Sequence, residues 1–555
     1  MDVCCQRRAR ARLLVVALCT WAATAATAAS AGPAPSLSAD PLTGNYQYRD
    51  AEGDALVAGV AVRLGGRWQS SADYPHHRVA EDTFREASGA SGRQLTIVHD
   101  GRTDLPELTV TLRQHEQPVW LEVALSARNA GKRPLQVQGL RALQAGEGGL
   151  ALAGTPGASA NGSSSATAWR VLSDSYSEDR PVLAVHDFGD EGAVHRAVGS
   201  QLLYDRDSGH SFFVGALRSA RWLTVARLHA EQGRATGLDV ESIGTTELAR
   251  EYSLEHSPPA DRIELALPLP AGARLEAEPL MVQVGADYHA QLEAYGEQVR
   301  ERLHARVDAP TPLGWWSWTA YYFGINQGSA LTNASALAER LRPLGYRYFH
   351  IDEGYQYARG EYATPDAAMF PGGMRALESH VTALGLVPGI WTAPFEVSER
   401  SWLFHQHPEW LVRNAAGRPI HIGYVDGEDQ LYALDTTHPG ARDYLRATYR
   451  TLVRDWGIRY IKLDFMEDSA VEGRHYRADT TALEAQRIGL QVIRDAVGDD
   501  VLLDKDGSPM LNPVGIIDTG RISVDTSHDY DDIRLSAGGV AARYYMNRRF
   551  FINDP

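Results

Sequence analysis

Two aspartates at the ends of apolar segments are the strongest candidates for catalysis. Asp464 closes the segment Ile458–Asp464, and Lys462 is predicted to face the same side because side chains alternate along a strand. The neighbouring cation is expected to keep Asp464 ionised, which suits a nucleophile or an electrostatic stabiliser. A structural salt bridge explains the same two residues equally well, and their spacing alone does not decide between the two explanations.

The second candidate, Asp525, closes the segment Arg521–Asp525 and is predicted to share a strand face with Arg521. Crowded carboxylates raise one another's pKa, so a member of this acidic region could stay protonated and act as an acid. The acidic run at 529–532 favours a solvated loop or a helix start, because no glycine-spaced calcium loop is present. Retaining glycoside hydrolysis requires two carboxylates about 5 Å apart, a nucleophile and an acid/base.

Aromatic and acidic side chains at neighbouring strand ends favour a sugar ligand. Flat rings stack on the apolar faces of pyranoses, and ionised Asp352 and Glu353 are able to accept hydrogen bonds from hydroxyls. We expect Trp315 to contribute most, and Trp316 and Trp318 to pack the barrel. Core packing is the competing explanation for the rings, and a helix N-cap is the competing explanation for the acids. The aromatic residues of this group are Trp315, Trp316, Trp318, Tyr321, Tyr322 and Tyr355.

Other chemistries have weaker support. His405 and His407 lie beside Pro408 with no third ligand at a recognised spacing, so no metal site is predicted. Ser508 lacks the G-x-S-x-G pattern of a serine-hydrolase elbow. All three cysteines precede residue 20, which excludes thiol catalysis and a thiolate metal site in the rest of the chain. The sequence implies no cofactor.

Two halves with different hydrophobic periods must position these residues. Period-two alternation with hairpin turns predicts antiparallel strands and a large β-sandwich over 37–287. A helical linker is predicted over 288–310, and short apolar strands then alternate with amphipathic helices over 311–555. No phosphate-binding glycine loop follows these strands, which disfavours a nucleotide-binding open sheet. The polar strand ends favour a (β/α)8-type (TIM) barrel.

Composition and the N-terminus limit the partners and the compartment. The chain has 555 residues, with 54 Lys plus Arg against 70 Asp plus Glu and no basic block, so we expect no nucleic-acid partner. Four arginines before residue 13, a short apolar core and small residues up to Ala31 predict a signal peptide over 1–31. The core is shorter than the roughly 20 residues of a membrane span. We therefore expect cleavage and a secreted or periplasmic protein without a membrane anchor.

Four motifs, in this order, resemble those of the melibiase-type α-galactosidases, and the nearer branch is glycoside hydrolase family 36, which is related to family 27. They are Gly314–Trp318, Ile351–Tyr355, Tyr460–Phe465 and Arg521–Asp525. The resemblance covers about residues 311–555, and the β-rich half also resembles the supersandwich of that family. It implies that Asp464 is the nucleophile of a double displacement and that Asp525 is the acid/base.

The resemblance also implies how the sugar is bound. Lys462 and Arg521 are implied to bind near the substrate, and Trp391 matches a barrel-strand aromatic residue of family 36. Asp352 and Glu353 match an acidic pair that holds the 4- and 6-hydroxyls of the sugar. Most relatives have a second aspartate at the position of Glu353, and the extra methylene moves this carboxylate outward.

The segment 550–555 resembles the seventh barrel strand of the family. We therefore expect an N-terminal antiparallel β-supersandwich followed by a barrel that is truncated after its seventh strand. The expected function is that of a secreted retaining α-glycosidase that hydrolyses terminal α-D-galactosyl residues of an oligosaccharide or glycoside. The alternatives are an α-N-acetylgalactosaminidase, a galactosyl transferase of the same fold and a non-catalytic carbohydrate-binding relic. The sequence leaves the oligomeric state open.

Overall fold

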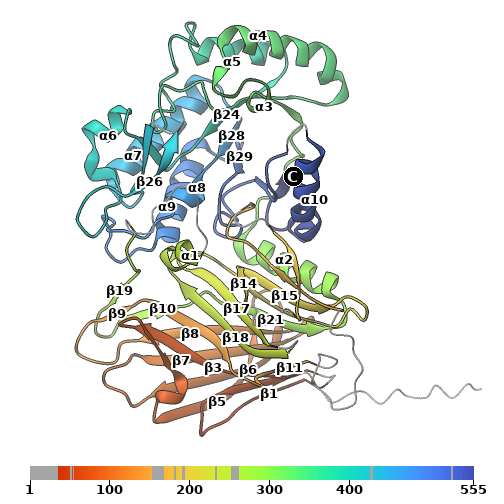
Figure 1. The fold of residues 1–555 in the computed structure, drawn as a ribbon, viewed down its shortest axis with the longest axis vertical. Helices are drawn as coiled ribbons and strands as arrows, with labels where there is room; N and C mark the ends of the chain where they lie inside the picture. The colour runs from red at the N-terminus through yellow and green to blue at the C-terminus, as the bar shows by residue number, and fades with distance from the viewer. Residues whose placement is uncertain are drawn as a thin grey trace, which may run out of the picture.

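The computed structural model describes residues 35–554 except for 51–52, 54, 153–167, 180–182, 190–193, 232–233, 252–261, 426–428 and 527–528. A β-sandwich forms one half of the molecule, and a helix-covered parallel sheet forms the other (Figure 1). The predicted signal peptide lies outside the described residues. Among the described residues, no helix is both long and apolar enough to cross a membrane.

The sandwich has two large sheets. The first runs in the order β1-β2-β3-β10-β18-β17-β14, with β4 and β11 pairing with β3. Its core follows in part from alternation, as in β2, where Tyr46 and Tyr48 are buried and the residues after each of them are more exposed. The strands of the first sheet are β1 (Ser36–Ala39), β2 (Tyr46–Arg49), β3 (Ala55–Leu64), β4 (Arg67–Ser70), β10 (Gly139–Ala145), β11 (Leu150–Ala151), β14 (Val194–Val198), β17 (Leu223–Glu231) and β18 (Arg234–Ile243).

The second sheet runs in the order β13-β12-β15-β16-β21-β8-β7-β6-β5, with β20 pairing with β8. In β7 the apolar residues Leu108, Val110 and Leu112 are fully buried at every second position. The strands are β5 (His76–Arg85), β6 (Ser91–Asp100), β7 (Glu107–Glu116), β8 (Val119–Arg128), β12 (Trp169–Ser173), β13 (Val185–Asp187), β15 (Ser200–Asp205), β16 (Ser211–Ala216), β20 (Arg274–Glu276) and β21 (Leu280–Gly285). A separate short pair joins β9 (Leu135–Val137) and β19 (Leu267–Leu269), and α1 (Thr245–Glu251) follows β18.

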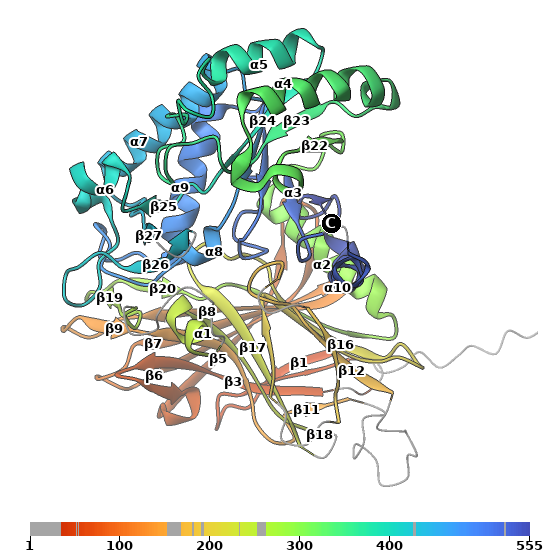
Figure 2. The ribbon, with the colours of Figure 1, turned by 45° about the horizontal axis from the view of Figure 1, so that its top comes forward.

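Helix α2 (Tyr288–Leu303) lies between the sandwich and the parallel sheet (Figure 2). Asp287 caps its first turn by accepting hydrogen bonds from two backbone N–H groups. Tyr295 is buried and donates its hydroxyl to the carbonyl oxygen of Ala216 in β16 at 2.8 Å. The helix therefore packs its apolar face on the second sheet.

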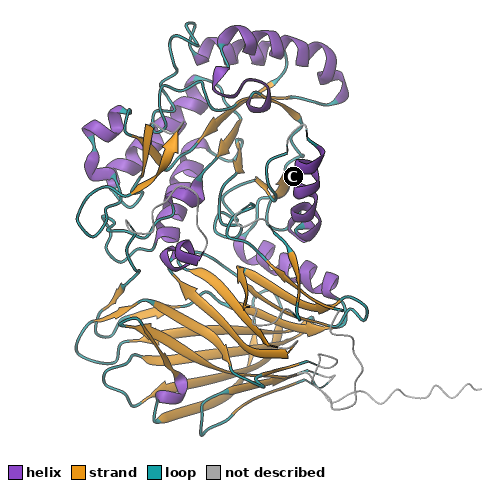
Figure 3. Cartoon of the chain, viewed as in Figure 1, coloured by secondary structure: helices purple, strands orange, loops and turns teal. Residues whose placement is uncertain are grey.

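The C-terminal half contains a seven-stranded, fully parallel sheet in the order β22-β23-β24-β28-β29-β30-β31. The helices gather in this half of the molecule (Figure 3). The predicted fold class, a supersandwich followed by a barrel with seven strands, is confirmed. The strands are β22 (Gly314–Trp316), β23 (Tyr348–Ile351), β24 (Val387–Thr392), β28 (Tyr460–Leu463), β29 (Leu502–Lys505), β30 (Thr519–Arg521) and β31 (Ile552–Asp554).

The remaining elements connect these strands. The α-helices are α3 (Trp318–Tyr321), α4 (Gln327–Ala336), α5 (Met374–Ala383), α6 (Trp402–Gln406), α7 (Pro439–Arg450), α8 (Met466–Ser469), α9 (Ala482–Val497) and α10 (Tyr530–Ala542). A small antiparallel sheet of β25 (Glu396–Ser398), β26 (His421–Val425) and β27 (Asp429–Ala433) lies between β24 and α7.

The predicted strand over 521–525 is wrong, because β30 ends at Arg521. Beyond it the Ser523 hydroxyl donates to the Ser536 carbonyl oxygen of α10 at 2.7 Å, so this segment turns toward the helix instead of extending the sheet. Asp525 therefore lies in a loop and not on a strand face.

Candidate active site

A cavity of about 300 Å³ lies at the carboxyl ends of the barrel strands. All of the sequence-predicted site residues except Trp315 line it, and so do several residues that the sequence did not single out. The predicted residues in its wall are Asp352, Glu353, Trp391, Lys462, Asp464, Arg521 and Asp525.

Asp464 directly follows β28, and both of its carboxylate oxygens accept hydrogen bonds. The Trp391 indole donates to Oδ2 at 2.7 Å, and the Phe465 backbone N–H donates to Oδ1 at 2.9 Å. Phe465 has a left-handed backbone with φ of 50°, an uncommon conformation for a bulky residue. This turn ends the strand and presents the Asp464 carboxylate to the cavity.

The ionisation of Asp464 differs from the expectation. Burial and the nearby Asp506 carboxylate together raise its pKa to about 7, although Lys462 and the hydrogen bond from Trp391 act in the opposite direction. Three carboxylates share the Lys462 ammonium. Its Nζ lies 3.3 Å from Asp464, 2.7 Å from Asp506 and 4.0 Å from Asp352. One shared cation is not enough to offset the burial.

Asp506 is the residue of this site that the sequence interpretation missed most clearly. It follows β29, and Lys462 Nζ and Arg521 Nη1 lie 2.7 and 2.9 Å from its Oδ2. These two cations hold the pKa of Asp506 well below its ordinary value, although burial acts in the opposite direction. The strand-end position that pointed to Asp464 also applies to Asp506 and would have found it.

Arg521 connects Asp506 to Asp525. Its second guanidinium nitrogen lies 2.5 Å from Asp525 Oδ1. The Asp525 side chain is 69% exposed, whereas that of Asp464 is 12% exposed. The two candidate catalytic carboxylates therefore occupy different environments, one buried and one at the open side of the cavity.

Asp352 and Glu353 follow β23 and are both buried. Burial favours the neutral form of Asp352, but Lys462 and His350 hold the pKa of this carboxyl below its ordinary value. Both oxygens of Glu353 accept hydrogen bonds from the Arg359 guanidinium, each at 2.8 Å. Arg359 also donates to Glu396 at 2.6 Å, so a buried ion-pair group fixes the orientation of the Glu353 carboxylate.

The tryptophan that lines the site cavity is not the one that we expected from the sequence. Trp318 lines the site cavity, together with Phe323 and Tyr424. Trp315 instead stacks on Phe349, with ring centroids 4.9 Å apart, and lines a neighbouring cavity of about 410 Å³. Trp316 lies beneath the Lys462 ammonium, which is 5.1 Å from its ring centroid.

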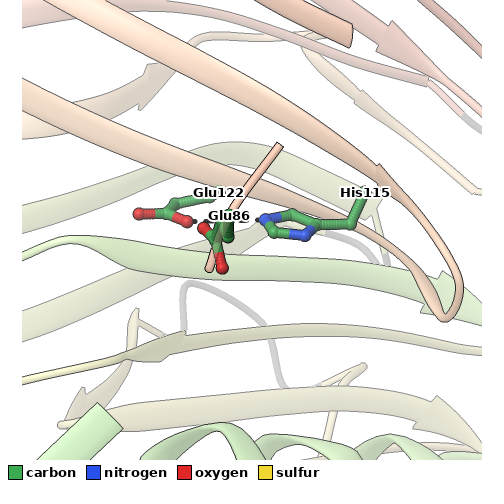
Figure 4. Close-up of side chains that lie close together, drawn as sticks. All are labelled: Glu86, His115 and Glu122. Atoms are coloured by element: carbon green, nitrogen blue, oxygen red, sulfur yellow. Dashed lines mark ion pairs between the residues drawn. The ribbon is translucent and has the colours of Figure 1, made fainter. Parts of the chain in front are cut away.

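Among the residues that the structure describes, one group of three has the arrangement of metal ligands, and it lies in the sandwich. Figure 4 shows Glu86, His115 and Glu122, whose ligand atoms lie within 4.8 Å of one another. Arg302 of α2 already occupies this group, since its guanidinium lies 2.8 Å from Glu122 and 3.9 Å from Glu86. We interpret it as an ion-pair cluster that attaches α2 to β8.

Comparisons with known proteins agree with the motifs. Residues 281–495 match the Melibiase family model. An α-galactosidase of Escherichia coli is 28% identical over 177 residues, which are 31% of this chain and 23% of that protein. The α-galactosidase AgaA of Geobacillus stearothermophilus is 29% identical over 196 residues, 34% of this chain and 25% of AgaA. These alignments span about a quarter of the length of the curated relatives.

Solved structures resemble a larger part of the chain. The crystal structure of AgaA, described as a family 36 α-galactosidase, aligns with a TM-score of 0.59 at 17% identity, over 89% of this chain and 67% of that one. An α-galactosidase from Thermus thermophilus in complex with p-nitrophenyl α-D-galactopyranoside aligns with a TM-score of 0.55 at 20% identity, over 82% and 83% of the two chains. The resemblance to the melibiase-type α-galactosidases of family 36 is confirmed, and these structures share the fold.

Proposed function

We propose that this chain, whose sequence carries a melibiase match, is a retaining α-glycosidase that hydrolyses terminal α-D-galactosyl residues by double displacement. The observation that carries the proposal is the single cavity in which Asp464, Asp525 and the sugar-binding candidates meet. Retaining hydrolysis requires two carboxyl groups at one site, a nucleophile and an acid/base, and Asp464 and Asp525 both line this cavity.

In the first step an oxygen of ionised Asp464 attacks the anomeric carbon, and the bond from that carbon to the leaving oxygen breaks. Asp525 gives its proton to the leaving oxygen. Trp391 and the Phe465 N–H hold the Asp464 carboxylate in place for the attack.

In the second step a water molecule replaces the leaving group. Asp525 takes a proton from the water, whose oxygen attacks the anomeric carbon, and the bond to Asp464 breaks. The products are the free sugar with retained configuration, an ionised Asp464 and a protonated Asp525. The mechanism is therefore complete with the residues of the chain and water.

The names of the relatives and the acidic pair support the galactosyl substrate. The relatives are α-galactosidases, and two of the solved structures hold stachyose or p-nitrophenyl α-D-galactopyranoside. In this chain Asp352 and Glu353 lie in the cavity wall and are available as hydroxyl acceptors. The cationic, apolar and small-residue pattern of residues 1–31 supports secretion as part of the proposal.

The test is hydrolysis of nitrophenyl glycosides by the purified chain. We expect cleavage of the α-galactoside in preference to the α-N-acetylgalactosaminide and the α-glucoside, and loss of turnover in Asp464→Asn. Asp443→Asn, an exposed position on α7, is the matched control and should keep full activity. Cleavage that survives in Asp464→Asn, or a folded chain that binds galactosides without cleaving any, would contradict the proposal.

A further inference from the structure

Arg359 lines the catalytic cavity, although it was not among the sequence-predicted site residues. It lies in the loop between β23 and α5 and is buried. Its guanidinium donates three hydrogen bonds to carboxylates, two to Glu353 at 2.8 Å each and one to Glu396 at 2.6 Å. The planar guanidinium matches the two oxygens of one carboxylate, so these contacts hold both side chains in one orientation. Arg359 is therefore a fixed part of the cavity wall.

The hydrogen bonds of Glu353 leave it one open acceptor position. An ionised carboxylate offers about four lone-pair sites, two on each oxygen. Glu353 Oε1 accepts from Arg359 Nε at 2.8 Å and from Gln356 Nε2 at 3.2 Å, so both of its sites are occupied. Among the described residues, Oε2 accepts only from Arg359 Nη2. One position on Oε2 therefore remains for a ligand in the cavity.

The Arg359 guanidinium also packs on two residues that hold Asp464. Its central carbon lies 4.4 Å from the ring centroid of Phe465 and 5.4 Å from that of Trp391. A guanidinium at these distances is attracted to the face of an aromatic ring. Trp391 and the Phe465 backbone N–H are the groups that donate to the Asp464 carboxylate. Because Phe465 has a left-handed backbone, the contact with its ring helps to maintain the turn that presents Asp464.

We propose that Arg359 is a positioning residue of the active site, which fixes the open acceptor position of Glu353 relative to the Asp464 carboxylate. The role rests on the proposed glycosidase function, because it concerns how the sugar is held against the nucleophile. Arg359 acts through Glu353, Trp391 and Phe465 and not on the reacting atoms. Since Glu353 has one open acceptor position, it binds a single hydroxyl group of the sugar.

Replacement of Arg359 by lysine separates geometry from charge. Lysine keeps the positive charge but lacks the planar fork, so Arg359→Lys loses the two parallel hydrogen bonds to Glu353. We expect KM to rise and kcat to fall, each by about tenfold. Arg494→Lys is the matched control, because Arg494 is also a buried arginine paired with a carboxylate, that of Asp518, but does not line the cavity. The control should lose thermal stability and keep kcat and KM within about twofold of the wild type.

A double-mutant cycle tests whether Arg359 acts through Glu353. In the Glu353→Gln background the carboxylate that Arg359 holds is already absent, so Arg359→Lys should have little further effect on KM. Part of its effect on kcat should remain, because Glu353→Gln does not remove the contacts of Arg359 with Phe465 and Trp391. Effects of the two substitutions on KM that simply multiply would contradict the proposal.

Monodeoxy substrates test whether Glu353 binds a single hydroxyl. The probes are nitrophenyl α-galactosides that lack the 2-, 3-, 4- or 6-hydroxyl, and each is compared between the wild type and Glu353→Gln. Glu353→Gln should lower kcat/KM for all of them except one, because that one lacks the hydroxyl that Glu353 binds. Two or more substrates that are insensitive to Glu353→Gln, or none, would overturn this part of the proposal.

A measurement that does not depend on activity is the comparison of crystal structures of the wild type and Arg359→Lys. We expect the Glu353 carboxylate to rotate and the Phe465 ring to move in the variant. Glu353 and Phe465 in their wild-type positions, or an Arg359→Lys variant that lowers only thermal stability, would overturn the proposal. A wild type that cleaves no glycoside would refute the proposed function, while the crystal structures would still decide whether Arg359 holds these two side chains.

Discussion

Replacement of Asp506 by asparagine tests the electrostatics of the site most sharply. Asp464 Oδ2 and Asp506 Oδ2 lie 3.3 and 2.7 Å from the same Lys462 Nζ, so the two oxygens are at most about 6 Å apart. At an effective dielectric constant of about 20, two unit charges at about 6 Å repel by about 3 kcal/mol. This energy corresponds to about two pKa units.

Asp506→Asn removes this repulsion and keeps the shape of the side chain. Because Asp506 raises the pKa of Asp464, its neutralisation should lower that pKa. The proposed nucleophile must be ionised, so the acid limb of the pH profile of kcat/KM should move to lower pH by up to about two units. The maximal rate should fall as well, since an amide oxygen accepts weaker hydrogen bonds from Lys462 and Arg521.

The assay is kcat/KM for the nitrophenyl α-galactoside across the pH range, with Asp443→Asn as the control whose profile should match the wild type. An acid limb that stays in place or moves to higher pH in Asp506→Asn would refute the reasoning. Such a result would mean that Asp506 does not act on Asp464 through its charge.

Three further predictions concern other contacts of the barrel. Trp391→Phe removes the 2.7 Å donor to Asp464, so kcat/KM should fall about 10- to 100-fold and the acid limb should move to higher pH, opposite to Asp506→Asn; an unchanged profile would contradict this. Gly507→Ala should abolish most activity, because Gly507 has φ of +53° and a Cβ at this position would lie 2.2 Å from a carboxylate oxygen of Glu467. Gly538→Ala is the control and should keep activity, because a Cβ at Gly538 would meet no atom within 4 Å. Glu378→Gln should stabilise the protein increasingly above pH 4.5, because burial raises the pKa of Glu378 well above that value and the unfolded chain gains about 1.4 kcal/mol per pH unit by ionising. Melting temperatures of wild type and Glu378→Gln that stay equally far apart from pH 4.5 to 8 would exclude this last effect.

The strand-end rule explains why much of the site was predictable. Parallel strands end at one rim, so Asp352, Lys462, Asp464 and Arg521 were expected together and line one cavity. The change of hydrophobic period likewise predicted a sandwich followed by a barrel. These features depend only on local pattern and on the common direction of the strands.

The features of the site that the sequence did not predict depend on contacts between segments that are far apart in the chain. Glu178 reaches the cavity from the sandwich, and no local pattern links it to Lys505 more than three hundred residues later. The raised pKa of Asp464 was not predictable either, because burial and the sharing of Lys462 arise only in the folded chain. Trp318 rather than Trp315 lines the cavity because Trp318 lies past the end of β22, whereas Trp315 lies within the strand and packs on Phe349.

The most direct test of the central claim is to trap the covalent intermediate on Asp464. A 2-deoxy-2-fluoro galactosyl fluoride with the α configuration should label the wild type, and mass spectrometry of the peptides should place one sugar on Asp464. Our account predicts this adduct, and it predicts no adduct in Asp464→Asn. A label on a different residue, or wild-type turnover that yields the inverted sugar without any adduct, would contradict it.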